Sequence, residues 1–299
     1  MIALQTIVPN PATALRLSQQ RPVLLVGSCF TEHIARRLAD SGFEVQANPF
    51  GILYNPISIA ECLRRCYSGE EITPDDLVCH NGLWHSWLHH GSFSCSSQDE
   101  CLRLCNEALR RTHQFLQLCP QIIVTLGTAY VYEHQGRVVA NCHKLPADAF
   151  IKRLLSVDEV RSAFAGLPIE SIIFTVSPIR HWADTPHGNQ LSKSTLLLAT
   201  QGCEYFPAYE IVMDELRDYR FYESDMLHPS AVAVEIIWER FCATYFAESV
   251  AQLALKYQKL HKMQAHRPLF PDSPDYQNHL AKIRSLQSEL DKSKINLNL

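Results

Sequence analysis

The sequence predicts a doubly wound α/β domain, in which helices cover both faces of a parallel sheet. Four short apolar runs have the composition of buried strands, and helical patterns separate them along the chain. A chain of 299 residues is also long enough to bury a large core. Ligands of such folds bind at the carboxyl ends of the strands, so we expect the loops that follow the four runs to meet at one site.

The first strand and helix meet at a serine. Residues 23–27 form an apolar run that ends at Gly27, and apolar residues then recur at helical spacing over 31–41. Ser28 lies between them, at a predicted helix N-terminus, where unpaired N–H groups and the helix dipole favour negative charge. This is a suitable place for a nucleophile whose substrate becomes an oxyanion. Serine is also a common N-cap residue, so position alone favours a capped helix.

The remaining elements follow in order along the chain. The other three buried strands are predicted at 43–47, 121–127 and 171–177. We divide the chain into a main domain at 1–250 and a helical C-terminal extension at 251–299. N-cap and capping-box residues mark several helix starts, and turn residues bound the shorter elements. These elements are helices at 56–67, 98–118, 157–165, 190–201, 211–216 and 229–246, a hairpin at 130–139 and a short strand near 205–206.

Composition and charge exclude several classes of function. Hydrophobic residues make up 46% of the chain and charged residues 19%, as in globular proteins. The formal net charge is −4 and no dense Lys/Arg cluster occurs, so we expect no nucleic-acid partner. No basic segment followed by a long apolar run marks a signal peptide, and 23–26 is too short to span a membrane. We therefore expect a cytoplasmic protein without a membrane partner, and the sequence leaves the oligomeric state open.

The eleven cysteines form no Cys-x-x-Cys pair. Cys62 and Cys66 are four residues apart, as are Cys101 and Cys105, which places each pair on one helix face. We expect them to be small buried apolar residues with free thiols in a reducing compartment. A zinc site is the alternative interpretation.

Ordered polar motifs follow the predicted strands, and through them the sequence resembles the GSCFA family over about residues 20–246. Thr31 stands where that family has the alanine of its name. The resemblance implies an SGNH/GDSL-like hydrolase with a flavodoxin-like three-layer α/β/α sandwich and a mainly parallel sheet. The motifs are Gly27-Ser28-Cys29-Phe30, Asn48-Pro49-Phe50-Gly51, Thr125-Leu126-Gly127-Thr128-Ala129, Ser177-Pro178-Ile179-Arg180-His181, Asn189-Gln190-x-Ser192-Lys193 and Asp225-x-x-His228-Pro229.

The same resemblance implies a serine esterase or O-acyltransferase that works through a Ser28 acyl-enzyme. His228 would be the general base and Asp225 would hold its imidazole in the required tautomer. A serine hydroxyl needs such a neighbouring base to become nucleophilic, so we expect Ser28 Oγ within hydrogen-bond reach of His228. A small acyl ester is the expected substrate, with carbohydrate O-acetyl esters among the candidates. This chemistry needs no cofactor and no metal.

Further site residues are expected in the same loops. The backbone N–H groups of Ser28 and Gly51 would form part of an oxyanion hole. The superfamily's Gly-x-Asn is absent after the third strand, because Gly127 precedes Thr128 and Ala129; Thr128 or Asn141 would then supply the remaining donor. The candidates for substrate binding, each of which could instead be structural, are Asn48, Arg180, His181, Asn189 and Lys193.

Other readings of these residues stay open. Cys29 could itself react at the helix N-terminus, although no separate Cys/His signature supports it. His89 and His90, with Trp84 and Trp87, could line a pocket or bind a metal, although an aromatic-rich insertion is the simpler interpretation. The missing Gly-x-Asn favours a second function, a binding or scaffold protein that kept the fold and lost the chemistry. A third is a metal-dependent hydrolase that uses the histidines of residues 80–90.

Overall fold

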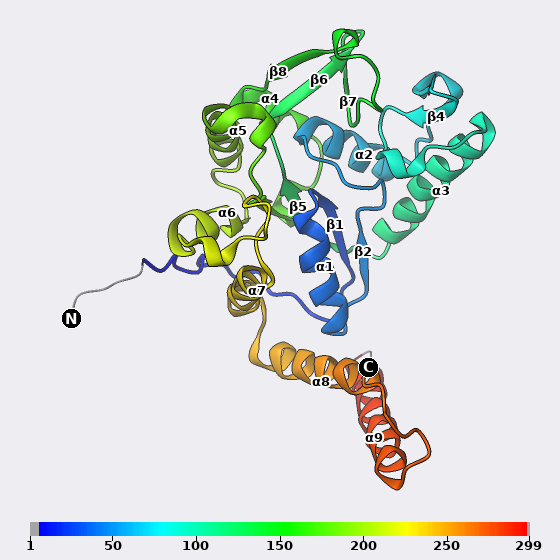
Figure 1. Cartoon of the computed structure of the whole chain (residues 1–299), viewed down its shortest axis with the longest axis vertical. Coiled ribbons are helices and arrows are strands. Elements are labelled where there is room, and N and C mark those ends of the chain that lie inside the picture. Colours follow the sequence, from blue (N-terminus) through cyan, green and yellow to red (C-terminus); the bar gives the residue numbers. More distant parts are fainter. Residues whose placement is uncertain (1–5, 298–299) are drawn as a thin grey trace.

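The computed structural model describes residues 6–297, and within them the core is a five-stranded parallel sheet (Figure 1). The strand order is β2–β1–β5–β9–β10. Counted along the chain, these five strands lie in the order 2-1-3-4-5, which is the flavodoxin-like arrangement. The order reverses between β1 and β5, so the switch point lies beside β1. The strands are β1 (Val23–Gly27), β2 (Val45–Ala47), β5 (Gln121–Leu126), β9 (Ile172–Val176) and β10 (Tyr205–Phe206).

Both faces of this sheet are buried, which explains why its strands are continuously apolar. Leu24 and Val26 of β1 belong to one hydrophobic core, whereas Val23 and Leu25 belong to the other. Successive strand residues point to opposite faces, so one apolar run supplies both cores. The predicted α/β class and mainly parallel sheet are confirmed.

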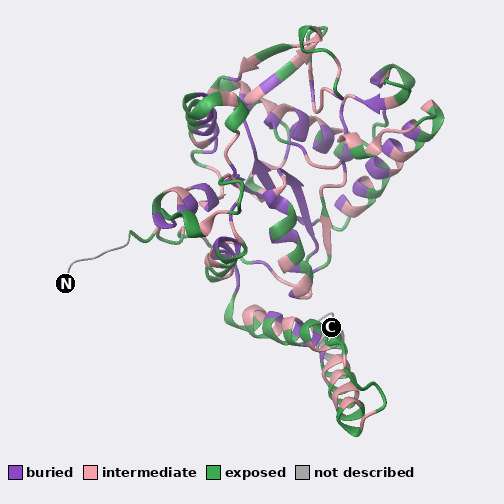
Figure 2. Cartoon of the chain, in the orientation of Figure 1, coloured by how far each residue is buried: buried purple, intermediate pink, exposed green. Residues whose placement is uncertain are grey.

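Helices cover the two faces of the sheet, with the buried side of each turned inward (Figure 2). One core takes its helical residues from α1 (Phe30–Asp40), α6 (Ala208–Glu210), α7 (Ala231–Tyr245) and the first part of α8 (Glu248–Gln264). A widened π-helical turn, Ile211–Glu215, continues α6. The other core takes them from α2 (Pro56–Ser68), α3 (Gln98–Leu116), α4 (Val157–Ala163) and α5 (Thr185–Ala199).

Capping side chains fix the starts of several helices. Asn55 accepts a hydrogen bond from Ser58 N at 2.8 Å, and Ser156 forms a full capping box with Glu159. The helix predicted at 190–201 begins earlier than expected, at Thr185. Pro186 explains the difference, because its fixed φ and missing N–H suit the first turn of a helix.

Two small antiparallel sheets are formed by segments inserted, along the chain, between the helices and strands of the main fold. β3 (Leu77–His80) pairs with β4 (Leu83–Ser86), in a part of the chain for which no strand was predicted. The predicted hairpin is β6 (Tyr130–His134) and β7 (Arg137–Val139), and β8 (Ile151–Leu154) pairs with β6 on its other side. The sequence did not indicate β8, because no residue of that strand is buried and no apolar pattern marks it.

The chain ends in a helical pair, α8 (Glu248–Gln264) and α9 (Pro274–Leu297), which projects from the sheet domain (Figure 1). Tyr257 and Leu260 pack with Leu290 in a small core of their own, and α8 also contacts α1. The division of the chain at residue 250 stays a prediction, and residues 298–299 lie outside the described part. None of the described helices has the length and apolar character needed to cross a membrane.

Candidate active site

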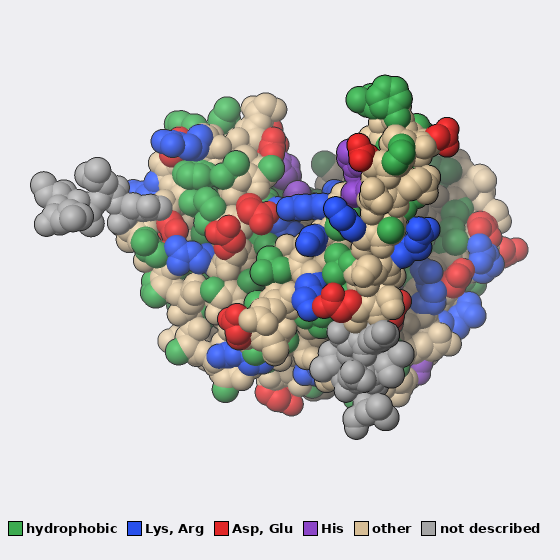
Figure 3. All heavy atoms as spheres, turned by 90° about the horizontal axis from the view of Figure 1, so that it is seen from below, with side chains coloured by type: hydrophobic (Ala, Val, Ile, Leu, Met, Phe, Trp, Pro, Cys, Tyr) green, Lys and Arg blue, Asp and Glu red, His purple; other side chains and the backbone are tan. Residues whose placement is uncertain are grey.

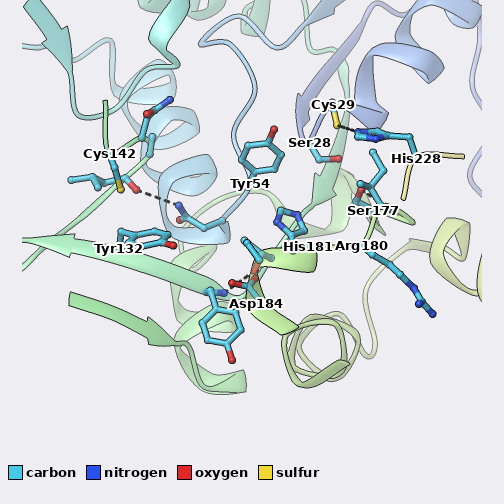
Figure 4. Close-up of a pocket in the computed structure, with 18 residues that line it drawn as sticks. Ser28, Cys29, Tyr54, Tyr132, Cys142, Ser177, Arg180, His181, Asp184 and His228 are labelled. Carbon is cyan, nitrogen blue, oxygen red and sulfur yellow. Dashed lines mark hydrogen bonds between the residues drawn. The ribbon is translucent and has the colours of Figure 1, made fainter. Parts of the chain in front are cut away.

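A cavity of about 470 Å³ opens at the carboxyl ends of β1, β5 and β9 (Figure 4). Ser28 and Cys29 come from the end of β1, Thr128 from the loop after β5 and His181 from the loop after β9. His228 reaches the same cavity from the loop before α7. The structure therefore brings together three of the four strand-end loops and the loop at 225–228, at the switch point where α/β folds bind ligands.

The turn after β1 is fixed by its contact with β5. Gly27 has φ +147° and pairs with Thr125, and a Cβ at Gly27 would lie 2.1 Å from Thr125 O. Ser28 N donates to the same carbonyl at 3.1 Å. Ser28 is only 1% exposed, and its buried Oγ has no hydrogen-bond partner. Cys29, one residue further, is the N-cap residue of α1 and is partly exposed.

Asp225 holds the His228 side chain in place. Its Oδ2 accepts a hydrogen bond from His228 Nδ1 at 2.5 Å. Its Oδ1 accepts from the backbone N–H groups of Leu227 and His228, at 2.8 and 2.9 Å. The backbone hydrogen bonds from His228 and Leu227, and then the imidazole, lower the pKa of Asp225 to about 2, so the carboxylate stays ionised. The predicted spacing of three residues therefore delivers an oriented Asp–His pair.

The second nitrogen of His228 faces Cys29 rather than Ser28. His228 Nε2 lies 3.8 Å from Cys29 Sγ (Figure 4). The structure contains no hydrogen bond between Ser28 Oγ and His228, because the buried Oγ has no partner. The reason is that Ser28 still follows the strand, with its backbone bonded to β5 and its side chain buried.

Burial and the helix N-terminus change the pKa of the Cys29 thiol in opposite directions. Burial raises its pKa, which keeps the sulfur protonated at neutral pH. Hydrogen bonds from the backbone N–H groups of Cys29 and Phe30 lower that pKa, but by less. The thiol therefore needs a base before it can react, and the imidazole Nε2 of His228 lies 3.8 Å from the sulfur.

The backbone N–H groups expected in the oxyanion hole already serve the fold. Besides Ser28 N, Gly51 N donates to Asn48 O at 2.8 Å, and Thr128 N donates to Tyr54 O at 3.0 Å. These groups complete the turn and loop hydrogen bonds that buried backbone requires. The Thr128 hydroxyl is also engaged, 3.0 Å from Ser192 Oγ.

Asn141 differs from the other expected oxyanion-hole donors in how its side chain is hydrogen-bonded. It lines the cavity, and its Oδ1 accepts a hydrogen bond from His143 N at 2.8 Å. That bond fixes the amide plane beside the cavity and uses the oxygen, not the donor nitrogen. Asn141 therefore keeps a side-chain donor at the cavity wall.

Two of the expected substrate-binding residues, Arg180 and His181, line the cavity. The His181 ring meets the Tyr54 ring edge-on at 5.4 Å, and burial lowers the pKa of His181 to about 4. It is therefore neutral at neutral pH. Arg180 points away from the Cys29–His228 pair (Figure 4), and its guanidinium approaches Met213 Sδ at 3.7 Å.

Asn48 and Asn189 hold the backbone of the site. Asn48 Oδ1 accepts a hydrogen bond from Gly27 N at 2.9 Å, and Asn189 Oδ1 accepts one from His181 N at 3.0 Å. Each side chain thus fixes a loop that reaches the cavity. Neither is among the side chains that line it.

Lys193 links the ends of two central strands. Its Nζ donates to Gly127 O at 2.6 Å and to Ser177 O at 2.8 Å. The side chain is 1% exposed, and burial lowers its pKa to about 7. Lysine at this position therefore spans the loops after β5 and β9, a structural contact that the sequence motif alone did not reveal.

The histidines of the inserted region stack on, or hydrogen-bond to, neighbouring side chains. His85 stacks on His143 with ring centroids 4.5 Å apart, and His89 Nδ1 lies 2.9 Å from Ser86 Oγ. Across residues 6–297, no group of three or more His, Cys, Asp or Glu side chains is placed to hold a metal ion. Cys62, Cys66, Cys101 and Cys105 are buried with free thiols, as expected.

Sequence reasoning missed the aromatic wall of the cavity. Tyr54, Tyr130 and Tyr132 line it, together with Asp184. Tyr130 and Tyr132 are two residues apart on β6, so they share a face of that strand. This alternation was visible in the sequence, but only the fold brings β6 over the ends of the parallel strands.

A second cavity of about 490 Å³ lies between α1, α7 and α8. Figure 3 looks onto this end of the molecule, where Lys, Arg and His side chains gather beside a hollow. Arg37 is paired there with Glu235 at 2.7 Å. The charged side chains that line it balance in sign, and they are Arg36, Arg37, Lys262, Asp40, Glu223 and Glu235.

Comparison with known proteins identifies the family. The model of the GSCFA family matches residues 22–241, which is most of the chain, so the protein belongs to this family. No curated protein and no solved structure matches the chain. The matched region ends within α7, before the helical pair α8–α9.

Proposed function

We propose that this member of the GSCFA family is an SGNH-like hydrolase that transfers an acyl group from a small ester to water or to a second hydroxyl. The reaction runs through a covalent acyl-enzyme formed on the turn at residues 28–29. His228 is the general base and Asp225 orients it. The observation that carries the proposal is the 2.5 Å Asp225–His228 contact, with the free imidazole nitrogen facing that turn.

The protonation states of this pair suit acyl transfer. His228 keeps its proton on Nδ1 and donates a hydrogen bond from there to Asp225. Nε2 therefore has a lone pair that can accept the proton of the nucleophile. The ionised Asp225 then stabilises the imidazolium, and the imidazolium returns the proton to the leaving alcohol. Water or an acceptor hydroxyl repeats the same steps on the acyl-enzyme.

The cavity supports a small ester of a polar alcohol. Its volume of about 470 Å³ lies within the range of small-molecule sites. Tyr130 and Tyr132 offer amphipathic rings, and Asn141 offers an amide, at the wall of the same cavity. Such a wall suits the faces and hydroxyls of a sugar, so carbohydrate O-acetyl esters are the first class to test.

A non-catalytic binding protein is the rival function. The N–H groups of Ser28, Gly51 and Thr128 are all engaged within the fold, which leaves fewer donors for an oxyanion. Such a protein would bind a sugar in the cavity and turn over no ester.

Ester turnover distinguishes the two functions. We expect the protein to hydrolyse a short-chain p-nitrophenyl ester and to release acetate from O-acetylated sugars, and we expect His228→Gln to abolish both. His261→Gln is the matched control, because His261 lies on α8 and does not line the cavity that contains Cys29 and His228. Equal turnover in the His228→Gln variant would contradict the proposal. Sugar binding without any ester turnover would favour the rival, and activity lost to a chelator would favour the metal-dependent alternative.

A further inference from the structure

Two neighbouring nucleophiles occupy the turn after β1, and their surroundings differ (Figure 4). Ser28 is 1% exposed, and its Oγ is buried without a hydrogen-bond partner. Cys29 is partly exposed, lines the cavity, and places its Sγ 3.8 Å from His228 Nε2. The side chain that meets the oriented imidazole is therefore the thiol.

The backbone explains why the two residues cannot exchange roles. Ser28 N is bonded to Thr125 O, and Gly27 O accepts from Leu53 N at 3.0 Å, so this part of the turn is held on both sides. These bonds fix the Ser28 backbone in the position that leaves its Oγ buried. Cys29 is the first residue beyond them and already has helical φ and ψ of −58° and −25°. Its side chain thus leaves the sheet at the point where the cavity begins.

The start of α1 also provides the donors that the reaction needs. The N–H groups of Cys29 and Phe30 hydrogen-bond the sulfur and are at the positive end of the helix dipole. No hydrogen bond of the described chain ties the Cys29 N–H to another backbone group. No backbone carbonyl competes for it, so it can turn from the sulfur to an oxyanion that forms next to the sulfur, whereas Ser28 N is held by Thr125 O.

Other thiols of the chain lack this combination. Cys62 and Cys66 are buried and donate to the carbonyls of Leu88 and Leu109. Burial strongly raises the pKa of both thiols. Cys29 instead combines a cavity, a helix terminus and the Asp225-oriented His228, as in cysteine–histidine catalysis.

We infer that Cys29, and not Ser28, is the nucleophile of the proposed reaction, so that the acyl-enzyme is a thioester. The inference rests on the proposed function. Cys29 Sγ gives its proton to His228 Nε2 and bonds to the carbonyl carbon of the ester. The tetrahedral oxyanion collapses, the carbon–oxygen bond to the alcohol breaks, and the alcohol takes the proton from His228. Water or a hydroxyl, deprotonated by His228, then displaces the sulfur, which recovers its proton from the imidazolium.

Trapping the acyl-enzyme tests this assignment directly. The wild type, Ser28→Ala and Cys29→Ala are mixed with p-nitrophenyl acetate, quenched in acid and mapped by mass spectrometry of peptides. We expect the acetyl group on Cys29 in the wild type and in Ser28→Ala, and no adduct in Cys29→Ala. Neutral hydroxylamine should remove it, because it cleaves thioesters much faster than oxygen esters.

The outcomes separate this inference from the proposed function. A hydroxylamine-resistant acetyl group on Ser28 overturns the assignment of Cys29 and leaves acyl transfer standing. No adduct and no His228-dependent turnover of any ester overturns both.

Alkylation provides a second test that needs no substrate. Iodoacetamide reacts with thiolates, so His228→Gln should slow the modification of Cys29 by about tenfold. Cys79 is the internal control, because it is exposed and lies on β3, away from the cavity. An equal rate for Cys29 in the wild type and in His228→Gln would overturn the inference, provided that Cys79 reacts alike in both.

Discussion

Two regions of this protein each place a histidine Nδ1 in a hydrogen bond, yet the two rings have different surroundings. In the loop before α7, His228 Nδ1 donates a hydrogen bond to the carboxylate of Asp225. Its Nε2 faces the Cys29 thiol, and both residues line the cavity. In the inserted region, His89 Nδ1 meets Ser86 Oγ at 2.9 Å, and its Nε2 is buried without a partner. One ring is linked to a carboxylate and a nucleophile, and the other is enclosed.

Burial accounts for the contrast in chemistry. His89 is 0% exposed, lies against the rings of Phe50 and Phe93, and has its pKa lowered to about 3. An imidazole that cannot take a proton at neutral pH is a poor general base. A candidate catalytic histidine is therefore better recognised by the partners of both its nitrogens than by the density of histidines around it.

Removing the Asp225 carboxylate should have the largest effect, which is a loss of ester turnover. Asp225→Asn leaves the loop in place but no longer fixes the imidazole tautomer, and we expect kcat/KM for esters to fall by roughly 10²–10⁴-fold. The unfolding free energy should change little, because Asp225 is exposed on its loop. Steady-state kinetics and urea unfolding measure the two quantities. Unchanged kinetics would remove the functional distinction between His228 and His89.

Removing His89 should instead destabilise the fold. His89→Ala leaves a cavity between Phe50 and Phe93 and removes one of the hydrogen-bond partners of the Ser86 hydroxyl, and we expect a loss of about 2–4 kcal/mol of unfolding free energy. The folded fraction should keep its turnover number. Urea unfolding combined with active-site titration measures both. A stable His89→Ala variant with lost turnover would show that the inserted region takes part in the reaction.

Lys193 lies between these extremes, since it is buried but holds the active loops. Lys193→Met should cost about 1–3 kcal/mol, because the carbonyls of Gly127 and Ser177 lose their donor. The folded pKa of Lys193, about 7, is below the unfolded value of 10.5, so between these values the unfolded chain binds the extra proton. The stability of the wild type should therefore rise relative to Lys193→Met as the pH increases through this window. A constant difference in urea unfolding across that range would argue against a buried, shifted amine.

The buried histidines should make the protein acid-sensitive, with an effect that is small at neutral pH and grows below pH 6.5. Burial lowers the pKa of His89 to about 3, and that of His143 and His181 to about 4, from an unfolded value of 6.5. Below that value the unfolded chain binds protons that the folded chain does not, so stability is lost as the pH falls from 6.5 towards 4. The slope should reach at most about 1.4 kcal/mol per pH unit for each histidine. His143→Gln should reduce the slope measured by urea unfolding, and an unchanged slope would exclude His143 as a contributor.

The sequence by itself determined the parallel-sheet core and the residues that mark its loops. The apolar run at 23–27 became β1 with the same bounds, because a strand buried on both faces needs apolar residues throughout. Caps at Asn55 and Ser156 act within one helical turn, so they too were visible in the sequence. The three-residue spacing of Asp225 and His228 likewise forms its contact within one loop.

Only the tertiary structure decided which side chain meets His228. Ser28 and Cys29 are adjacent, and the choice between them depends on how far the pairing of β1 with β5 extends into the turn. That pairing joins residues about a hundred positions apart, and it turns Ser28 inward and Cys29 towards the cavity. The engagement of the expected oxyanion donors has the same origin. Local sequence specifies what a loop can do, and the long-range hydrogen bonds of the sheet specify which of its atoms are free to do it.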